Sequence, residues 1–366
     1  MDQPLKVLIV DDSSLYRRIL SNSVQNISIS TVIETAPTGA IALKKIEPFQ
    51  PDVILLDIEM PEMSGIEVLK SVKQDHPRIT VVLVSGVNSR SADITMEGLA
   101  SGASDFIPKP TGSSVEENTR ELQANLRKVL ELASARVQNR QGAGPSPARV
   151  VAPPQPSTIA RTAPSILPAR LEIIGIGIST GGPGALDVMI PQLPKNLSLP
   201  VVIVQHMPPV FTESLARSLD RKSEIAVCEA KDGQVLEAGM VYIAPGGIHT
   251  IVRGVTDQEQ RKLIIAYDDG APVNSCKPAV DVLFNSLART TGGRTLAIVM
   301  TGMGRDGRDG AANIKAKQGY CLSQSEDTCT VYGMPHAVDE AGISDESVPL
   351  PDMASRIHSI ANGLRL

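Results

Sequence analysis

The chain has 366 residues, a formal net charge of −5 and 42% hydrophobic residues. Its length predicts two domains, or three, and its acidic balance argues against nucleic acid as the main partner, because phosphate binding needs a concentrated basic face. The four cysteines include no Cys-x-x-Cys pair, so we expect reduced thiols and neither a disulfide framework nor a zinc site. No signal peptide is expected, and no apolar run approaches the ~18 residues of a membrane span. These features predict a cytoplasmic protein.

Residues 5 to about 132 alternate short apolar strands with amphipathic helices. The segments LKVLIV, TVIET, DVILLD, ITVVLVS and SDFIPK are expected strands, and a helix rich in Glu, Leu and Arg is expected over about 115–132. Strands that alternate with helices at this spacing predict a parallel sheet covered on both faces.

Polar side chains follow the strands of this first predicted sheet. Asp11 and Asp12 follow the first strand, Asp57 ends the third, Ser85 ends the fourth and Lys109 follows the fifth. Three carboxylates at one sheet edge repel each other, which predicts a hard cation such as Mg²⁺ among them. Asp57 is then a candidate to attack a phosphoryl donor, with Lys109 and Ser85 contacting the phosphoryl oxygens. Each residue taken singly is better explained as a helix cap or a surface acid, whereas five of them at successive strand ends favour the phosphorylation site.

The segment 4–132 resembles the response-regulator receiver domain. The motifs that carry the resemblance are DD at 11–12, DIEMPEMSG at 57–65, VSG at 84–86 and KP at 109–110. The resemblance implies a flavodoxin-like fold with phosphorylation at Asp57. The residues implied to hold Mg²⁺ are Asp11, Asp12, Asp57 and, through its carbonyl, Glu59. The implied switch residues are Ser85, Phe106 and Lys109.

The composition changes after this segment. Residues 134–169 are rich in Pro, Ala, Ser and Arg and show no sustained periodicity. Such a segment buries too little apolar surface to offset its ordering entropy, which predicts a flexible linker. The expected domains are therefore residues 1–133 and 170–366.

The second expected domain restarts the alternation. LEIIGIGIS and LPVVIVQHM are expected strands, with GPGALDVMIPQL as the crossover helix between them. GMVYIAPGG, HTIVRG and KLIIAYDD are shorter and favour a meander, and the helix PAVDVLFNSLART precedes the strand TLAIVMTGM. This order predicts a second doubly wound α/β domain of Rossmann-like type.

The stretch IIGIGISTGGPGAL, residues 173–186, fits two kinds of site. Its glycines resemble a relaxed dinucleotide fingerprint, in which backbone N–H groups hold a pyrophosphate. Its Gly-x-Ser-x-Gly pattern around Ser179 also fits a nucleophile elbow. A dinucleotide site needs an acidic residue after the next strand, but that strand ends in Gln205 and His206. The absence of the acid disfavours the dinucleotide interpretation.

Ser179, His206 and Asp306 each follow an expected apolar strand. Serine needs a neighbouring base to become nucleophilic, and the base needs an orienting carboxylate. Glycines around Asp306 would let backbone N–H groups approach an oxyanion. The order Ser–His–Asp differs from the Ser–Asp–His of α/β-hydrolases, so the pattern does not imply that fold. Taken singly, the three residues are also explained as a helix N-cap, a loop histidine and a turn former.

Nearly the whole chain resembles the family of bacterial chemotaxis protein-glutamate methylesterases, CheB. The motifs that add to the receiver pattern are GISTGGP, QHMP, IAPGG, VDVLF, TGMGRDG and YGMP. The resemblance implies Ser179 as nucleophile, His206 as general base and Asp306 as its orienting carboxylate. It also implies that Thr180 and the backbone around Met303 support the nucleophile or the oxyanion.

The resemblance further implies what the protein acts on. Members of the family hydrolyse γ-glutamyl methyl esters on chemoreceptors and deamidate certain receptor glutamines. The unphosphorylated receiver blocks the catalytic domain until the chemotaxis histidine kinase phosphorylates it. A monomer is expected, with no cofactor in the catalytic domain and membrane contact only through receptors. A competing hypothesis is a response regulator whose second domain only binds a partner. A DNA-binding output domain is disfavoured, because no helix-turn-helix pattern follows residue 170.

The chain departs from the family pattern at a few positions. Ile178 precedes the expected nucleophile where a small residue is more usual, which predicts a tighter floor of the site. Cys276 and Lys277 stand where a His-Arg pair is common, and His336 stands where an arginine is usual. We expect these changes to affect substrate preference and rate more than reaction type.

Overall fold

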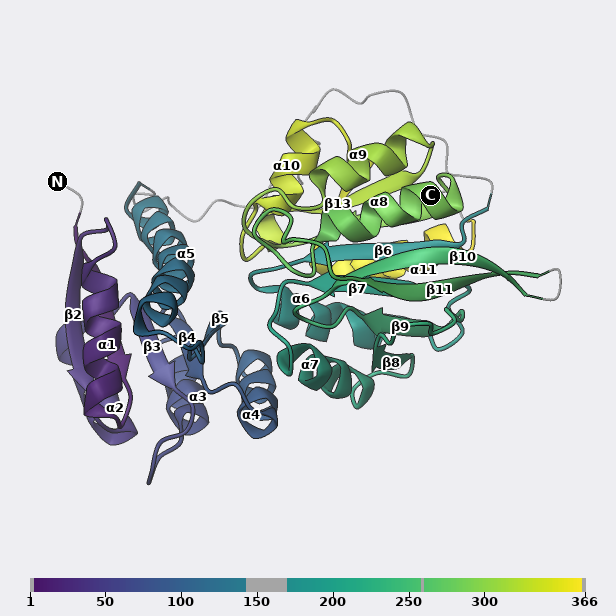
Figure 1. Ribbon diagram of the computed structural model, residues 1–366. Coiled ribbons are helices and arrows are strands. Elements are labelled where there is room, and N and C mark those ends of the chain that lie inside the picture. The colour runs from purple at the N-terminus through teal and green to yellow at the C-terminus, as the bar shows by residue number, and fades with distance from the viewer. Residues whose placement is uncertain (1–2, 143–169, 258–259, 364–366) are drawn as a thin grey trace. The chain divides into compact units, whose positions relative to one another are not determined.

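The computed structural model describes residues 3–142, 170–257 and 260–363. The chain divides into two compact units, Met1–Pro164 and Ser165–Leu366, and each has its own sheet (Figure 1). Within the described ranges, no helix combines the length and the apolar character needed to cross a membrane.

The first unit is built on a five-stranded parallel sheet of order β2-β1-β3-β4-β5. Its strands are β1 (Leu5–Val10), β2 (Thr31–Ala36), β3 (Val53–Asp57), β4 (Thr80–Ser85) and β5 (Asp105–Pro108). Its helices are α1 (Ser14–Gln25), α2 (Gly39–Phe49), α3 (Gly65–Asp75), α4 (Ser89–Ala100) and α5 (Val115–Gly142). This strand order is that of flavodoxin-like folds, which confirms the predicted receiver fold.

Both faces of this sheet are buried. Alternate residues of β1 point to opposite faces, so Val7 and Ile9 pack in a core with residues of α1 and α5. Leu8 and Val10 pack in a second core with residues of α2 and α3. Two apolar faces explain why the strands are near-continuous hydrophobic runs.

Helix α5 is longer than the sequence pattern predicted. It was expected to end near residue 132, with a linker over 134–169, but it continues to Gly142. The apolar spacing continues past the expected end, because Ala133 and Val137 pack in the same core as Leu126 and Leu130. Residues 134–142 are therefore helical, and the rest of the expected linker, 143–169, lies outside the described residues.

The second unit is built on a seven-stranded parallel sheet of order β14-β13-β12-β6-β7-β9-β8. Its strands are β6 (Ile173–Ile178), β7 (Val201–Gln205), β8 (Ala226–Glu229), β9 (Met240–Ile243), β12 (Thr295–Val299), β13 (Tyr320–Gln324) and β14 (Glu346–Val348). An antiparallel hairpin joins β10 (His249–Asp257) and β11 (Gln260–Asp268). The doubly wound, Rossmann-like prediction is confirmed.

Helices cover both faces of this sheet, as Figure 1 shows. They are α6 (Gly182–Met189), α7 (Phe211–Asp220), α8 (Val280–Thr291), α9 (Arg308–Ala316), α10 (Met334–Glu340) and α11 (Leu350–Ala361). Helices α8, α9 and α10 pack on one face together with the hairpin. Helices α6 and α7 lie on the other face, and α11 packs against α6.

The predicted meander was wrong in part. Strand β9 pairs in parallel with both β7 and β8, inside the main sheet, and the hairpin is formed by β10 and β11. The crossover that makes β9 parallel runs through α7 and β8, which the sequence pattern did not reveal. Because Val241 and Ile243 of β9 are fully buried, the strand belongs between neighbours and not at a surface turn.

The chain leaves β6 toward β7 on one side of the sheet and later returns through β12 on the other. A parallel α/β sheet binds its ligands where the strand order reverses in this way, at the carboxyl ends of the strands. The fold therefore places the candidate site beside the ends of β12, β6 and β7.

Candidate functional site

A tight turn joins β6 to α6 and carries Ser179. The Ser179 N–H donates to the Thr301 carbonyl at 2.9 Å, and the Ser179 carbonyl accepts from Gly182 N–H at 2.8 Å. Gly181 lies between them with φ of 75°, a left-handed conformation that glycine adopts without strain. The serine therefore sits on a strand-to-helix turn, the geometry of a nucleophile elbow.

The glycines of β6 have a packing role. A Cβ on Gly177 would lie 2.3 Å from Cγ1 of Val280, and one on Gly175 would lie 2.6 Å from Cδ1 of Leu287. Both neighbours belong to α8, so the glycines let this helix approach the strand closely. Close helix packing and a tight turn account for the pattern that resembled a dinucleotide fingerprint.

His206 follows β7 and lies beside the turn. Ile178 and Gln205 are register partners, and the His206 N–H donates to the Ile178 carbonyl at 3.1 Å. The Gln205 side-chain amide donates to the carbonyls of Ser179, at 3.0 Å, and His206, at 3.2 Å. This buried glutamine holds together the two strand ends that carry the serine and the histidine.

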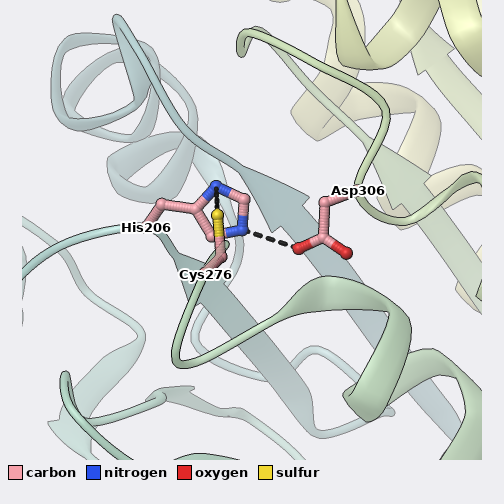
Figure 2. A group of neighbouring side chains, drawn as sticks. All are labelled: His206, Cys276 and Asp306. Carbon is pink, nitrogen blue, oxygen red and sulfur yellow. Dashed lines mark hydrogen bonds and ion pairs between the residues drawn. The ribbon is translucent and has the colours of Figure 1, made fainter. Parts of the chain in front are cut away.

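His206 and Asp306 form the best-defined contact of the site. The imidazole Nε2 donates to Asp306 Oδ2 at 2.7 Å (Figure 2). The histidine side chain is 12% exposed and the aspartate side chain 3%. A buried carboxylate bonded to one ring nitrogen fixes the orientation and the tautomer of the imidazole.

Asp306 is held at the N-terminus of α8. Its carboxylate accepts from the N–H groups of Val280 at 2.7 Å and Asp281 at 3.0 Å, and from the Asn274 amide at 3.0 Å. Burial alone would raise the pKa of Asp306, but the bonds to His206 and to these donors hold it below its usual range. The carboxylate is therefore ionised at neutral pH.

The second imidazole nitrogen faces a thiol. His206 Nδ1 lies 3.5 Å from Cys276 Sγ, and Figure 2 shows the sulfur and the carboxylate against different nitrogens of one ring. Burial lowers the pKa of His206, but the contacts with Asp306 and Cys276 outweigh it and raise this pKa to about 9. The resting imidazole is therefore protonated at neutral pH.

This protonation predicts the pH profile of a reaction that uses His206 as a base. Only the neutral ring accepts a proton, so kcat/KM is expected to rise about tenfold per pH unit toward a plateau near pH 9. Initial rates from pH 6 to 10 test this, with the Ser179→Ala protein measuring background hydrolysis. A plateau that begins at about pH 6.5 would mean an unperturbed imidazole.

The oxyanion candidates have unused donors. Among the described residues, the backbone N–H groups of Thr180 and Met303 donate to no other group. The hydroxyl of Ser179 likewise makes no hydrogen bond within the described part of the chain, to His206 or to any other residue. In proteins without substrate, the nucleophile–base hydrogen bond is often long and tightens only in the complex. The roles of these residues remain predictions.

Sequence reasoning missed the residues that hold the candidate triad in place. Asn274 bonds both Asp306 and Asp281, at 3.0 and 2.9 Å. Asp281 also accepts from Gly310 N–H at 2.7 Å, and burial raises its pKa. The available signal was a single acid, Asp281, in the otherwise apolar VDVLF segment. Gln205 precedes the expected base His206 in the sequence, but it served only as evidence that the strand does not end in the acid of a dinucleotide site.

The departures from the family pattern lie in different surroundings. Ile178 is fully buried, and Lys277 donates to the Asp269 carboxylate at 2.6 Å. His336 is exposed on α10 and lies 3.8 Å from Glu340. Ile178 accepts a backbone hydrogen bond from His206, whereas the side chain of Cys276 contacts the imidazole of this candidate base.

In the first unit, the predicted acidic cluster forms at the ends of β1 and β3. Asp11, Asp12 and Asp57 offer carboxylate oxygens that all lie within 4.8 Å of one another. Lys109 Nζ donates to Asp11 Oδ2 at 3.0 Å and to Asp57 Oδ2 at 2.9 Å. The structure thus brings together the carboxylates and the lysine that the strand ends predicted.

Burial raises the pKa of Asp57 to about 6, despite the lowering effect of Lys109 and with a further increase from Asp11. The same carboxylates raise the pKa of Lys109 against the effect of its burial. A second cation beside Asp57 would favour its ionised form. A set of hard oxygen ligands with an excess of negative charge is what Mg²⁺ prefers, so the donor set fits the expected ion.

The expected switch residues lie at the predicted strands: Ser85 ends β4, Phe106 lies in β5 and Lys109 follows β5. Ser85, at the end of β4, accepts from Thr95 Oγ1 at 2.7 Å. Phe106 of β5 is half-buried against the core of the α2 and α3 face. The Glu59 side chain accepts from Ser91 Oγ at 2.9 Å, and its N–H donates to Asp57 Oδ1 at 3.4 Å. None of these contacts assigns a switch role, which stays a prediction.

Comparison with known proteins covers both units. Residues 174–357 match the family described as CheB methylesterase, and residues 7–120 match the response regulator receiver domain. The protein-glutamate methylesterase/protein-glutamine glutaminase of Desulfotalea psychrophila is 42% identical, over 96% of this chain and 97% of that protein. The protein of the same name from Geobacillus kaustophilus is 41% identical, over 96% of this chain and 97% of that protein.

Solved structures resemble the two units separately. The CheB methylesterase catalytic domain of Thermotoga maritima is 40% identical, with a TM-score of 0.49, and covers 52% of this chain and 100% of that one. The response regulator domain of Thermotoga maritima CheB is 36% identical, with a TM-score of 0.32, and covers 36% of this chain and 98% of that one. With its receiver domain and methylesterase domain in one polypeptide, the chain belongs to the CheB methylesterase family.

Proposed function

We propose that the protein is a phosphorylation-activated protein-glutamate methylesterase that also deamidates glutamines, with chemoreceptors as its substrates. The observation that carries the reaction type is the His206–Asp306 hydrogen bond of 2.7 Å beside the Ser179 turn. The full-length similarity to proteins named protein-glutamate methylesterase/protein-glutamine glutaminase supports the substrate class. Both reactions transfer an acyl group to water, so one triad serves them.

In the proposed reaction, the Ser179 hydroxyl attacks the side-chain ester carbonyl and its proton passes to neutral His206. Because Nε2 is bonded to Asp306, the accepting nitrogen is Nδ1. The negative charge on the tetrahedral oxygen accepts from the N–H groups of Thr180 and Met303. As the intermediate collapses, the methoxy group leaves as methanol with the proton from His206.

Water then completes the turnover. It gives a proton to His206 and attacks the acyl-serine, which releases a glutamate side chain and restores the Ser179 hydroxyl. A glutamine side chain follows the same course with ammonia as the first leaving group. Asp306 stays ionised throughout and stabilises the imidazolium that forms twice in each cycle.

The receiver supplies the proposed control. Asp57 accepts the phosphoryl group, Lys109 contacts the phosphoryl oxygens, and Ser85 and Phe106 respond to the modification. Asp11, Asp12, Asp57 and the Glu59 carbonyl would hold Mg²⁺, which supplies positive charge against the phosphoryl oxygens when bound. The proposed phosphodonor is the histidine kinase of the same chemotaxis system, and a monomer acting in the cytoplasm meets these requirements.

The direct experiment incubates the full chain with a methyl-esterified receptor fragment and measures methanol release. A second arm follows ammonia release from the unmodified fragment, which tests deamidation. A rate above the buffer blank for the ester supports the proposed esterase. No release of methanol, with or without a phosphodonor, would favour a second domain that only binds a partner.

Asp57→Asn is expected to abolish activation by a small-molecule phosphodonor, since an amide is a poor nucleophile and forms no acyl phosphate. The unstimulated hydrolysis rate is expected to stay within about twofold of wild type, because Asp57 lies in the other unit from Ser179. Rates with and without acetyl phosphate and Mg²⁺ test this. Asp75→Asn, at the end of α3, is the matched control and should still respond. Equal stimulation of both variants would contradict phosphorylation at Asp57.

Removal of the receiver is expected to raise the unstimulated rate, because the proposed inhibition needs that unit. The extent of α5 sets the cut after Gly142 and not after residue 133, so that no partial helix remains. The truncated and full-length proteins are compared without phosphodonor, with thermal unfolding as a check on the fold. Equal rates for two folded proteins would argue against a blocking receiver.

A further inference from the structure

We propose that Cys276 is a covalent modification site for small electrophiles, including hydrogen peroxide, and that its modification disables the base His206. The first half depends only on geometry and thiol chemistry. The second half rests on the proposed function, because it concerns the nitrogen that accepts the proton from Ser179.

The inference starts from the two nitrogens of the His206 imidazole. Asp306 occupies Nε2 of His206 at 2.7 Å, and Cys276 Sγ lies 3.5 Å from Nδ1. The two ring nitrogens thus link the thiol to the carboxylate, as the dashed lines in Figure 2 mark. A thiol in contact with an imidazole nitrogen is the setting in which cysteines react as nucleophiles.

A structured turn holds the thiol in this position. The backbones of Val273 and Cys276 exchange two hydrogen bonds, of 3.1 and 2.9 Å. Between them, Asn274 and Ser275 have φ of 52° and 61°, the two left-handed residues of a type I′ turn. The Asn274 amide also donates to Asp306 at 3.0 Å. The turn is therefore anchored to the same carboxylate that orients the imidazole, which fixes the sulfur relative to the ring.

The other three cysteines have different surroundings. Cys321 is fully buried, and burial raises its pKa. Burial also raises the pKa of Cys228, and it raises that of Cys329 to about 12. These thiols stay protonated at neutral pH and react slowly. Cys276 is partly exposed and is the thiol in the described part of the chain that contacts an imidazole.

The proposed reaction with hydrogen peroxide uses Cys276 as the nucleophile and His206 as the proton donor. The thiolate of Cys276 attacks one peroxide oxygen, a sulfur–oxygen bond forms and the oxygen–oxygen bond breaks. The departing hydroxide takes the Nδ1 proton of His206 and leaves as water. Sulfur is oxidised to the sulfenic acid and peroxide is reduced to water. Two equivalents of a small thiol reverse the step, giving a disulfide of that reagent, water and the restored Cys276 thiol.

Modification of Cys276 places a new group beside Nδ1 of His206, the nitrogen that accepts the proton in the proposed reaction. A sulfenic hydroxyl or a carbamidomethyl group on Sγ occupies the space beside Nδ1, the nitrogen not bonded to Asp306. The ring then has no free nitrogen to accept the proton of Ser179. Hydrolysis is expected to fall when Cys276 is modified and to return when a thiol reduces the sulfenic acid.

The test of the first half is competitive labelling of the full-length protein with limiting iodoacetamide, followed by peptide mass spectrometry. At pH 7 we expect Cys276 to label at least tenfold faster than Cys228 in the same sample. His206→Gln should slow Cys276 at least tenfold and leave Cys228 unchanged.

Cys321 reports folding in the same spectra, because this fully buried thiol labels only when the chain opens. Should His206→Gln unfold the protein, the comparison of Cys276 with Cys228 in the unsubstituted protein still decides the matter. Labelling of Cys276 no faster than Cys228 would overturn the proposal.

The second half is tested by adding hydrogen peroxide before the ester assay. The rate of the unsubstituted protein should fall at least tenfold and recover with dithiothreitol. The Cys276→Ala protein, whatever its starting rate, should lose less than twofold under the same treatment, and Cys329→Ala should behave like the unsubstituted protein. Fast labelling of Cys276 without peroxide inactivation would overturn the link to the base. Absence of any ester hydrolysis instead removes the proposed function and leaves the labelling result standing.

Discussion

Replacing Ser179 with alanine is expected to lower kcat/KM for ester hydrolysis by on the order of 10⁵-fold, because the acyl group then has no oxygen to receive it. The residual rate reflects substrate binding and the N–H groups of Thr180 and Met303, which act on water attack as well. The fold should not change, since the Ser179 contacts in the structure use its backbone atoms. Methanol release under single-turnover conditions measures the loss.

Ser198→Ala is the matched control, because it removes an exposed hydroxyl that bonds only the Ala361 carbonyl, at 3.2 Å. Its rate should stay within twofold of the unsubstituted protein. A Ser179→Ala protein that keeps more than a tenth of the original kcat/KM would show that another group attacks the ester. In that outcome, Cys276 is the first alternative nucleophile to replace, because its sulfur contacts Nδ1 of His206.

Asp306→Asn is the substitution with the second largest expected effect, about 10⁴-fold in kcat. An asparagine side chain has one acceptor oxygen and two N–H donors. Asp306 instead accepts on both oxygens, from His206 and the N–H of Val280 on Oδ2 and from the N–H of Asp281 on Oδ1. The amide group would face at least one donor whichever way it turned. The imidazolium would also lose its counter-charge, so the base would be held in the wrong tautomer and less basic.

This substitution should also destabilise the catalytic unit, by about 1–3 kcal/mol, since buried donors at the start of α8 lose an acceptor. Thermal unfolding and the ester assay are measured on the same preparation. Asp309→Asn, at a side chain that is 62% exposed, is the matched control and should change neither. A variant with normal stability and a rate within tenfold of the original would show that Asp306 does not orient the base.

Much of both sites followed from the positions of strand ends. Parallel strands finish at one edge of a sheet, so Asp11 and Asp57 could be placed together from sequence, and so could His206 beside the turn of Ser179. Those predictions required only that each apolar run be recognised and ended correctly. His206 and Asp306, which are 100 residues apart in the chain, lie in direct contact at this edge of the sheet.

The positions of the loop residues could not be predicted in the same way. Cys276 was noted only as a departure from the family pattern, because its place beside His206 depends on a two-residue turn and on where α8 begins. Asn274 bonds Asp306 only because that turn folds back over the N-terminus of the helix. Propensity does not determine such a docking, since it depends on two segments that meet only after the sheet is assembled.

The errors in the fold have a similar origin. The meander was expected because the apolar segments over 239–268 look short in the sequence and are bounded by glycines, a local signal of reversing turns. Strand β9 instead pairs in parallel with β7 and β8, and its apolar residues are buried. The end of α5 was misjudged because Ser134, Ala135 and Arg136 share the composition of the predicted linker. The helical spacing nevertheless continues in the core from Leu130 through Ala133 to Val137.

The contact between Gly177 and Val280 couples the sheet to the chemistry. The same residue that lies where a Cβ of Gly177 would collide also donates its N–H to Asp306. Any side chain added to this strand residue would therefore shift the start of α8 and, with it, the carboxylate that orients the imidazole. A displacement of about 1 Å at a reacting centre lowers rates by about 100-fold. The distance between β6 and α8 thus determines how Asp306 and His206 are aligned for proton transfer, although neither Gly177 nor Val280 takes part in the reaction.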